Sequence, residues 1–361
     1  MESWPVMDGM FSGVFALEIG IDAQHAGTPI KGFSVTMFAQ AWSIFVSWGD
    51  GTADRYINET FVDPQHTYNS PGTYTLLYVG IPHWAGIPTT GWANIAPFVK
   101  KVLTPFPRLR EEQGLPTLQG ADKMTEICDN LYTNARYLDS PLTWISNLFE
   151  GCASLTEVGN SVFSGVNMRA DGQFSILDGL FRNASALRSV GDIFHGYGFT
   201  GVTEVYSIFA GCTALKNISE GVFRTMPNVR VMSGCFSNSG LLDIPPGLFS
   251  RQADLERAGK CFSGTNITTI PPGLFSHNPN LTSVAGCFSW TKITTIPEDL
   301  FSQCPNIEDF EGCFEGCSDI VGNVPALWEQ YPDANGDACF RGCVNAANYD
   351  DIPLEWRRRE I

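Results

Sequence analysis

The sequence is short of charge, and above all of positive charge. Charged residues make up 17% of the 361 residues, and 22 Lys and Arg stand against 38 Asp and Glu, which gives a formal net charge of −16. An acidic surface repels phosphate backbones, so we expect no nucleic-acid partner. The hydrophobic fraction of 43% is typical of a globular chain and not of a disordered one.

Long apolar runs are missing as well. No stretch reaches the roughly 18–20 apolar residues that a membrane-spanning helix needs, so we expect no membrane insertion. Near the N-terminus, Glu2 and Asp8 stand where a signal peptide carries positive charge, and no long apolar core follows them. We therefore expect no export by the usual secretory route. An extracellular role would need another route, such as release within an assembled particle.

The common signatures of catalysis are absent too. The five histidines are scattered without metal-ligand spacing, and there is neither a Gly-x-Ser-x-Gly elbow nor a phosphate-binding glycine loop. We therefore predict that the chain is not an enzyme. One segment, Asp333-Ala-Asn335-Gly-Asp337, matches the start of a calcium loop but lacks the downstream glutamate that completes one. Asp333, Asn335 and Asp337 are the candidate metal ligands, and a plain Asn-Gly turn is the alternative.

What the sequence does contain is a strict repeat. Five cysteines recur every 26 residues, each directly before a phenylalanine: Cys235, Cys261, Cys287, Cys313 and Cys339. A period of this size is typical of a solenoid, in which one supersecondary unit stacks on its next copy. Eleven cysteines cannot all pair with one another. We predict reduced, buried thiols that act as small hydrophobes, with some oxidised pairs as the alternative.

Phenylalanines mark the same units. Their intervals are longer and uneven up to Phe236 and match the constant cysteine interval after it, at positions Phe149, Phe181, Phe209, Phe236, Phe262, Phe288, Phe314 and Phe340. A second series, which includes Phe249, Phe275 and Phe301, divides the later units into two equal halves. Both halves carry β-branched residues in alternation, so we expect two strand segments per coil around a phenylalanine spine. A short helical turn that starts at Pro297 is left open.

Two segments show the repeat most clearly. Phe149-Glu-Gly-Cys-Ala-Ser-Leu-Thr-Glu-Val158 and Phe209-Ala-Gly-Cys-Thr-Ala-Leu-Lys-Asn-Ile218 resemble the 26-residue repeat of bacterial surface proteins, the BspA-like leucine-rich repeats. The resemblance implies a leucine-rich-repeat solenoid with a C-terminal cap over residues 131–361. It also implies an adhesive surface role, in host-associated bacteria or in the gene products of their phages.

The N-terminal region, 1–80, has a β pattern. Segments 15–21, 33–38, 44–48 and 73–79 alternate or run apolar between turn residues. Val46-Ser-Trp-Gly-Asp-Gly-Thr52 and the later His66-Thr-Tyr-Asn-Ser-Pro-Gly-Thr-Tyr-Thr75 resemble the signature of polycystic-kidney-disease-type (PKD) domains, which are immunoglobulin-like β-sandwiches. The resemblance implies a mainly β chain that begins with such a sandwich over 1–80, with Trp48 in its core. Residues 81–130, rich in Pro, Gly and Trp, are expected to connect and cap the solenoid.

One residue stands out in the repeat. The second residue after each phenylalanine is Gly151, Asn183, Gly211, Asn238, Gly264, Trp290, Gly316 or Gly342. Glycine and asparagine tolerate a left-handed backbone, so we predict a left-handed turn at this position. Trp290 breaks the pattern and is the candidate ligand-binding residue, as an exposed platform for a sugar ring or a protein. The alternative is a differently shaped turn in which the indole covers a neighbouring gap.

These features together predict a non-enzymatic surface binding or adhesion protein. We expect the solenoid to contact a glycan or protein on a target cell, and we expect display in several copies, because shallow contacts gain strength from avidity. A virion surface (tail or head decoration) or another extracellular surface is the expected location. We expect no cofactor, and calcium is the one alternative that the sequence leaves open. The alternative is an architectural spacer or decoration protein without a ligand of its own.

Overall fold

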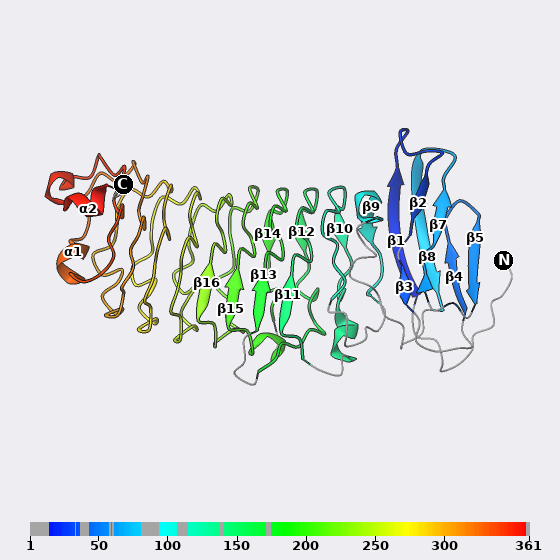
Figure 1. Cartoon of the computed structure of the whole chain (residues 1–361), viewed down its shortest axis with the longest axis horizontal. Coiled ribbons are helices and arrows are strands. Elements are labelled where there is room, and N and C mark those ends of the chain that lie inside the picture. The colour runs from blue at the N-terminus through cyan, green and yellow to red at the C-terminus, as the bar shows by residue number, and fades with distance from the viewer. Residues whose placement is uncertain are drawn as a thin grey trace.

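The protein forms an elongated rod, with a β-sheet region at one end and two short helices near the other (Figure 1). The computed structural model describes residues 14–32, 34–36, 43–57, 59, 61–80, 94–106, 115–137, 141–170, 175–195 and 197–358. The N-terminal segment 1–13 and the Trp- and Pro-containing segment 81–93 lie outside this set. Within it, no helix is long and apolar enough to cross a membrane.

An antiparallel sheet forms the N-terminal region. Its strands, in the order in which they lie side by side, are β1 (Val14–Ile21), β8 (Gly72–Val79), β4 (Ser43–Ser47) and β5 (Ala53–Ile57). Two short antiparallel pairs accompany it: β2 (Pro29–Lys31) with β7 (Gln65–Thr67), and β3 (Val35–Thr36) with β6 (Phe61–Val62). The strands predicted at 15–21, 44–48 and 73–79 are confirmed. Of 33–38, only Val35–Thr36 is a described strand.

A tight turn between β4 and β5 positions the core of this region. Gly49 and Gly51 have φ angles of +81° and +94°, and a Cβ on Gly49 would lie 2.7 Å from the Thr75 main chain, so glycine is required there. Trp48 is fully buried before the turn, and its main-chain oxygen accepts a 2.8 Å hydrogen bond from the Tyr68 hydroxyl. The predicted hairpin turn and core tryptophan are therefore confirmed.

The N-terminal sheet continues without a break into the coils. Strand β9 (Val99–Val102) pairs antiparallel with β1 on one side and parallel with β10 (Glu126–Ile127) on the other. The result is a six-stranded sheet in the order β10-β9-β1-β8-β4-β5 (Figure 1). The sequence indicated only capping material in this segment. Residues 95–106 instead contain strand β9, which pairs on one side with the N-terminal sheet and on the other with the first coil.

The coils that follow are joined by parallel pairing. One sheet consists of β11 (Trp144–Ser146), β13 (Ile176–Asp178), β15 (Glu204–Tyr206) and β16 (Val231–Ser233), and a smaller one of β12 (Glu157–Val158) and β14 (Ser189–Val190). Short 3-10 turns lie at Ala96–Phe98, Thr133–Tyr137, Tyr197–Phe199 and Tyr349–Asp351. This stacking confirms a repeat solenoid.

The expectation of two strands per coil is wrong for the regular 26-residue coils. After β16 the ladder continues as single bridges that join Val231, Arg257, Ser283, Asp309 and Asn335 in turn. A 26-residue coil spends most of its length on turns, and one such bridge links each coil to the next. Main-chain hydrogen bonds between coils nevertheless persist. The segment at Pro297 is a single turn, in which the Leu300 N–H donates to the Pro297 oxygen at 3.2 Å.

Two phenylalanine stacks fill the solenoid. Along the main series from Phe149 to Phe340, successive ring centroids lie 5.1–5.8 Å apart with interplanar angles of 5–14°. In the second series, Phe275 stacks between Phe249 and Phe301 at 5.6 and 5.7 Å. Edge contacts join the two series, as between Phe275 and Phe288 at 6.4 Å. The predicted phenylalanine spine is confirmed, and it is double.

The last coil is closed by C-terminal aromatic residues. Helix α2 (Leu354–Arg357) carries Trp356, whose ring centroid lies 5.8 Å from Phe310 and 6.4 Å from Phe340. The Phe340 N–H donates to the Trp356 oxygen at 2.7 Å, which continues the ladder by one more step. Helix α1 (Leu327–Gln330) adds Trp328, edge-on to Phe340 at 6.3 Å. The spine therefore ends against an indole and not against water.

The thiols are reduced and enclosed. All eleven cysteines are free, ten are buried, and Cys128 is half-buried. Several donate to a carbonyl oxygen of the preceding coil, as Cys261 does to Met232 at 3.2 Å and Cys317 to Phe288 at 3.0 Å. Burial raises the pKa of Cys152 and of Cys304 to about 12. The prediction of buried thiols that act as small hydrophobes is confirmed.

Truncation of the main stack should be severe. We expect Phe288→Ala to lower the free energy of unfolding by about 3–5 kcal/mol, because it leaves a cavity between two stacked rings. Phe288→Leu, which refills part of that volume, should cost clearly less. Urea denaturation followed by circular dichroism measures both. A loss below about 1 kcal/mol for Phe288→Ala would contradict the role given to the stack.

The buried thiols should resist modification. A thiol with a pKa of about 12 is thiolate to only about one part in ten thousand at pH 8, so the native chain should leave its ten buried cysteines unreacted with a disulfide reagent. The denatured chain should titrate eleven. Because folding raises these pKa values above the ordinary 9.0, stability should be complete below about pH 9 and fall as pH rises toward 12. Stability that rises over this range would contradict the assignment.

Candidate functional site

Left-handed turns shape one edge of the solenoid. The second residue after each main-series phenylalanine has a φ angle between +55° (Asn238) and +84° (Gly342) in all eight coils from Gly151 onward. The predicted left-handed turn is confirmed. Trp290 has φ +59°, so its turn has the same hand as the others and is not differently shaped.

A second left-handed position escaped the sequence analysis. The residue two before each main-series phenylalanine has a φ angle between +51° and +62°, at Asn147, Gly179, Ser207, Gly234, Lys260, Gly286, Gly312 and Ala338. Four of these are glycine, which is the signal that could have revealed the column. Serine, lysine and alanine at the same position obscured it, because they seldom adopt this backbone.

Trp290 is held in this turn and remains exposed. Its side chain is 61% exposed, and its N–H donates to the Glu315 oxygen of the next coil at 2.6 Å. The indole lies over Gly316, where an added Cβ would come within 2.5 Å of the ring. Asn183 and Asn238 lie over Gly211 and Gly264 in the same way. Each larger residue in this column is therefore accommodated by a glycine one coil further on.

Exposed polar side chains follow Trp290 in the chain. Lys292, Thr294 and Thr295 are exposed, as are Asn266, Thr268 and Thr269 one coil earlier. The Lys292 N–H donates to the Ile267 oxygen at 3.0 Å and the Thr294 N–H to the Thr268 oxygen at 3.1 Å, which sets the two segments in register. We name these six residues and Trp290 the Trp290 strip. The strip therefore exposes hydroxyl, amide and ammonium groups in the chain segment that follows Trp290 and in its neighbour one coil earlier.

The predicted calcium ligands form part of a turn and a ladder. The Asn335 side-chain oxygen accepts from the Asp337 N–H at 3.1 Å, and its amide donates to Asp309 at 3.1 Å. Asp333 lies two residues earlier in the same loop. Among the residues that the structure describes, no group of three or more His, Cys, Asp or Glu side chains is arranged to hold a metal ion. Calcium binding at Asp333, Asn335 and Asp337 stays a prediction.

The N-terminal turn holds a His–Asp contact with a structural role. Asp50 accepts from the Thr52 N–H and hydroxyl at 3.0 and 2.6 Å, and His66 Nε2 lies 2.8 Å from its other oxygen. Burial acts to raise the pKa of Asp50, but these hydrogen bonds outweigh it and lower the pKa to about 2. The His66 ring also stacks on Trp48 at 4.8 Å. The contact ties β7 to the turn between β4 and β5.

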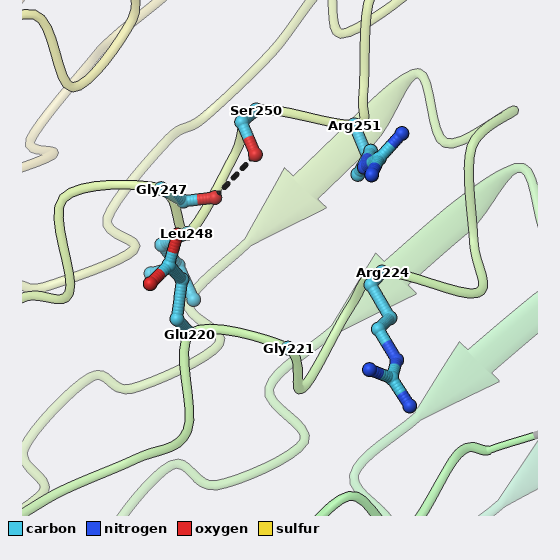
Figure 2. A pocket seen from close by; sticks show the side chains of 7 residues that line it. All are labelled: Glu220, Gly221, Arg224, Gly247, Leu248, Ser250 and Arg251. Atoms are coloured by element: carbon cyan, nitrogen blue, oxygen red, sulfur yellow. Dashed lines mark hydrogen bonds between the residues drawn. The ribbon is translucent and has the colours of Figure 1, made fainter.

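One groove was not anticipated from the sequence. A cavity of about 330 Å³ lies between two adjacent coils, lined by Glu220, Gly221, Arg224, Gly247, Leu248, Ser250 and Arg251 (Figure 2). Arg224 makes a 2.5 Å ion pair with Asp192. The signal in the sequence was a pair of arginines spaced by about one coil, which mattered only once the register between coils was known.

The strain at Trp290 is measurable. We expect Trp290→Asn to raise the free energy of unfolding by about 0.5–1 kcal/mol, since asparagine tolerates the left-handed backbone better than tryptophan. The reciprocal Asn238→Trp should lower it by a similar amount, because Gly264 leaves room for the ring just as Gly316 does at Trp290. Urea denaturation measures both. Destabilisation by Trp290→Asn would show that the indole stabilises the coil, contrary to this account.

Comparison with known proteins assigns no family. No family model matches the chain, and no curated protein matches it. Among solved structures, it is similar to a chain in the "Crystal structure of TLR13-ssRNA13 complex", with 14% identity, a TM-score of 0.22, and coverage of 63% of this chain and 40% of that chain. A TM-score of this size supports no argument. The assignment as a repeat solenoid rests on the coil-to-coil ladder and the phenylalanine stacks.

Proposed function

We propose that the chain is a non-enzymatic binding protein whose solenoid contacts a glycan or protein on a target cell through the Trp290 strip. One observation carries the proposal: a 61% exposed indole occupies a left-handed turn where the other seven coils have glycine or asparagine. That backbone costs a residue other than glycine roughly 1–2 kcal/mol. An exposed ring recovers little of this cost by burial, so a ligand is the reason to place tryptophan there.

The chain is also proposed to join two known modules. A BspA-like leucine-rich-repeat solenoid accounts for the 26-residue spacing of cysteine and phenylalanine. A PKD-type, immunoglobulin-like sandwich accounts for the buried Trp48 and the glycine turn between β4 and β5. In this arrangement the sandwich attaches the chain to a larger assembly, and the solenoid projects from it.

Display in several copies follows from the shape of the strip. The Trp290 strip is an exposed surface and not an enclosed pocket, so a single contact is weak. Linked copies convert the second contact into an intramolecular one and raise the overall affinity by about 10²–10⁴. A virion surface, at the tail or as head decoration, supplies such an array, as does another extracellular surface.

An architectural spacer is the second candidate function. It is favoured by the single sheet that runs from β5 through β9 to β10 and makes the N-terminal region and the coils continuous. A continuous ladder resists bending at the junction, which is what a spacer requires. In this case the exposed Trp290 would have no partner.

The two candidates differ in what Trp290→Asn does to binding. The full chain, displayed on beads, is applied to a glycan array and to candidate host cells. We expect binding that falls at least tenfold in Trp290→Asn. The matched control is Trp144→Asn, because Trp144 is 62% exposed on an earlier coil and lies outside the strip. It should leave binding unchanged.

The opposite outcomes are equally informative. If no glycan and no cell surface is bound, the chain is a spacer. If binding is seen but both tryptophan variants reduce it equally, the ligand does not lie on the Trp290 strip.

A further inference from the structure

Lys260 is an exception in the second left-handed column, as Trp290 is in the first. Its φ angle is +55°, a backbone that lysine seldom adopts, and the coils on either side have Gly234 and Gly286 at this position. Its side chain is exposed. Residues held in such a backbone often have a functional reason, so the role of this lysine is a question separate from that of Trp290.

The Lys260 side chain crosses to the coil that carries Trp290. A Cβ added to Gly286 would lie 3.0 Å from Lys260 Cγ and 3.7 Å from its Cε. The same point is 3.6 Å from the hydroxyl of Ser289, the residue before Trp290. The Ser289 N–H donates to the Gly286 oxygen at 3.1 Å, so these residues form one turn. Lys260 therefore covers the first residue of a turn in which Trp290 is the last.

The hydroxyl groups close to Lys260 are already occupied. The Ser289 hydroxyl donates to the Gly286 oxygen at 2.9 Å, and the Ser263 hydroxyl lies 2.8 Å from it. Ser289 is also buried, with 6% of its surface exposed. These hydroxyl groups hold the turn in place, and it is the Lys260 ammonium group that remains for a ligand.

The positive charge of Lys260 is not paired within the described part of the protein. Among those residues, no carboxylate lies within ion-pair distance of it. The carboxylate of Glu315, over Gly312 one coil beyond Gly286, is already paired with Arg341. In a chain with a net charge of −16, an unpaired lysine in an unfavourable backbone points to an anionic partner.

We propose that Lys260 makes the Trp290 strip selective for an acidic glycan, and that it binds a carboxylate on the sugar residue next to the one that stacks on Trp290. The indole extends over Gly316, on the coil of Phe314, whereas the Lys260 side chain lies over the coil of Phe288. The ring centroids of these two phenylalanines are 5.5 Å apart. The two side chains are therefore offset by one coil, and a carboxylate that reaches Lys260 belongs to the neighbouring sugar.

The polar character of the strip favours a glycan over a protein as the carrier of this charge. A protein interface requires a desolvated apolar core, but the strip residues other than Trp290 are asparagine, lysine and threonine. A polyanion is also disfavoured, because a chain with a net charge of −16 repels it. A glycan with one carboxylate among neutral sugars fits both conditions. The proposal rests on the proposed function, because it uses the same strip.

Two pairs of probes test the charge preference on the full chain. Sialyllactose is compared with lactose, and a disaccharide of glucuronic acid and N-acetylglucosamine with its carboxyl-reduced form, each titrated by calorimetry or by NMR. A peptide of alternating glutamate and glycine is the probe for a protein partner.

The variants separate the charge of Lys260 from its backbone. Lys260→Gln removes the charge and preserves approximate length, whereas Lys260→Gly restores the residue that the neighbouring coils have. Two controls remove the same charge elsewhere. Lys292→Gln changes another lysine of the strip, and Lys216→Gln changes an exposed lysine on an earlier coil.

We expect at least one acidic probe to bind about tenfold more tightly, or better, than its neutral partner, because a charge-assisted hydrogen bond is added. Both Lys260 variants should remove this preference, while Lys292→Gln and Lys216→Gln keep it. Trp290→Asn should weaken the acidic and the neutral probe by the same factor, since both stack on the indole. Lys260→Gly should not lower the urea midpoint, because glycine suits the left-handed backbone.

Several results would overturn the role of Lys260. They are equal binding of acidic and neutral probes, no binding of either acidic probe, a preference that survives both Lys260 variants, and an equal loss in Lys216→Gln. Peptide binding as tight as that of the acidic sugars would indicate a protein partner instead. Cell binding that depends on Trp290 without a preference for acidic probes would reject the role of Lys260 alone. A preference set by Lys260, together with cell binding indifferent to Trp290, would reject the Trp290 strip and leave the contact at Lys260 standing.

Discussion

The hydrogen-bonded ladder between coils is the constraint on which the rest of this structure depends. Each coil presents main-chain N–H and C=O groups that only the next coil can satisfy, as in the bonds from Phe288 to Cys313 and from Phe262 to Cys287, both at 2.9 Å. The same spacing brings phenylalanine rings to 5.5–5.8 Å along the regular coils and encloses the thiols beside them. The spacing between coils thus sets both the main-chain hydrogen bonds and the stacking of the rings.

A ladder of this kind leaves two open ends, and the chain closes them differently. At the N-terminal end, β9 pairs with β10 and also with β1, so the first coil passes into a conventional antiparallel sheet. At the C-terminal end, Trp356 covers the last phenylalanine and its main chain accepts the last ladder hydrogen bond. An exposed strand edge can pair with another chain and cause aggregation. The pairing of β9 and the cover by Trp356 each remove one such edge. The first also makes the sheet region and the solenoid a single continuous body.

Function is proposed where residues depart from the repeat. The other seven coils have glycine or asparagine in the turn column, so the tryptophan at position 290 is an exception, and its ring lies over Gly316 of the next coil. The cavity between the coils of Phe223 and Phe249 is an exception of another kind, since later coils carry small polar residues such as Ser276 where this cavity has Arg224. In both places a solenoid built from near-identical units acquires a feature that its other coils lack.

The sequence by itself determined the periodic part of this protein. Spacing of Phe and Cys predicted the coils, the spine and the reduced thiols, and the run of Gly and Asn predicted the left-handed turn, because these depend on neighbours at a constant interval. Only the tertiary structure decided the role of β9, the second left-handed column at residues such as Lys260, and the cavity that Arg224 and Arg251 both line. Each of these depends on which residues of different coils or sheets lie opposite one another. That register is set by packing over the whole rod, and no local pattern encodes it.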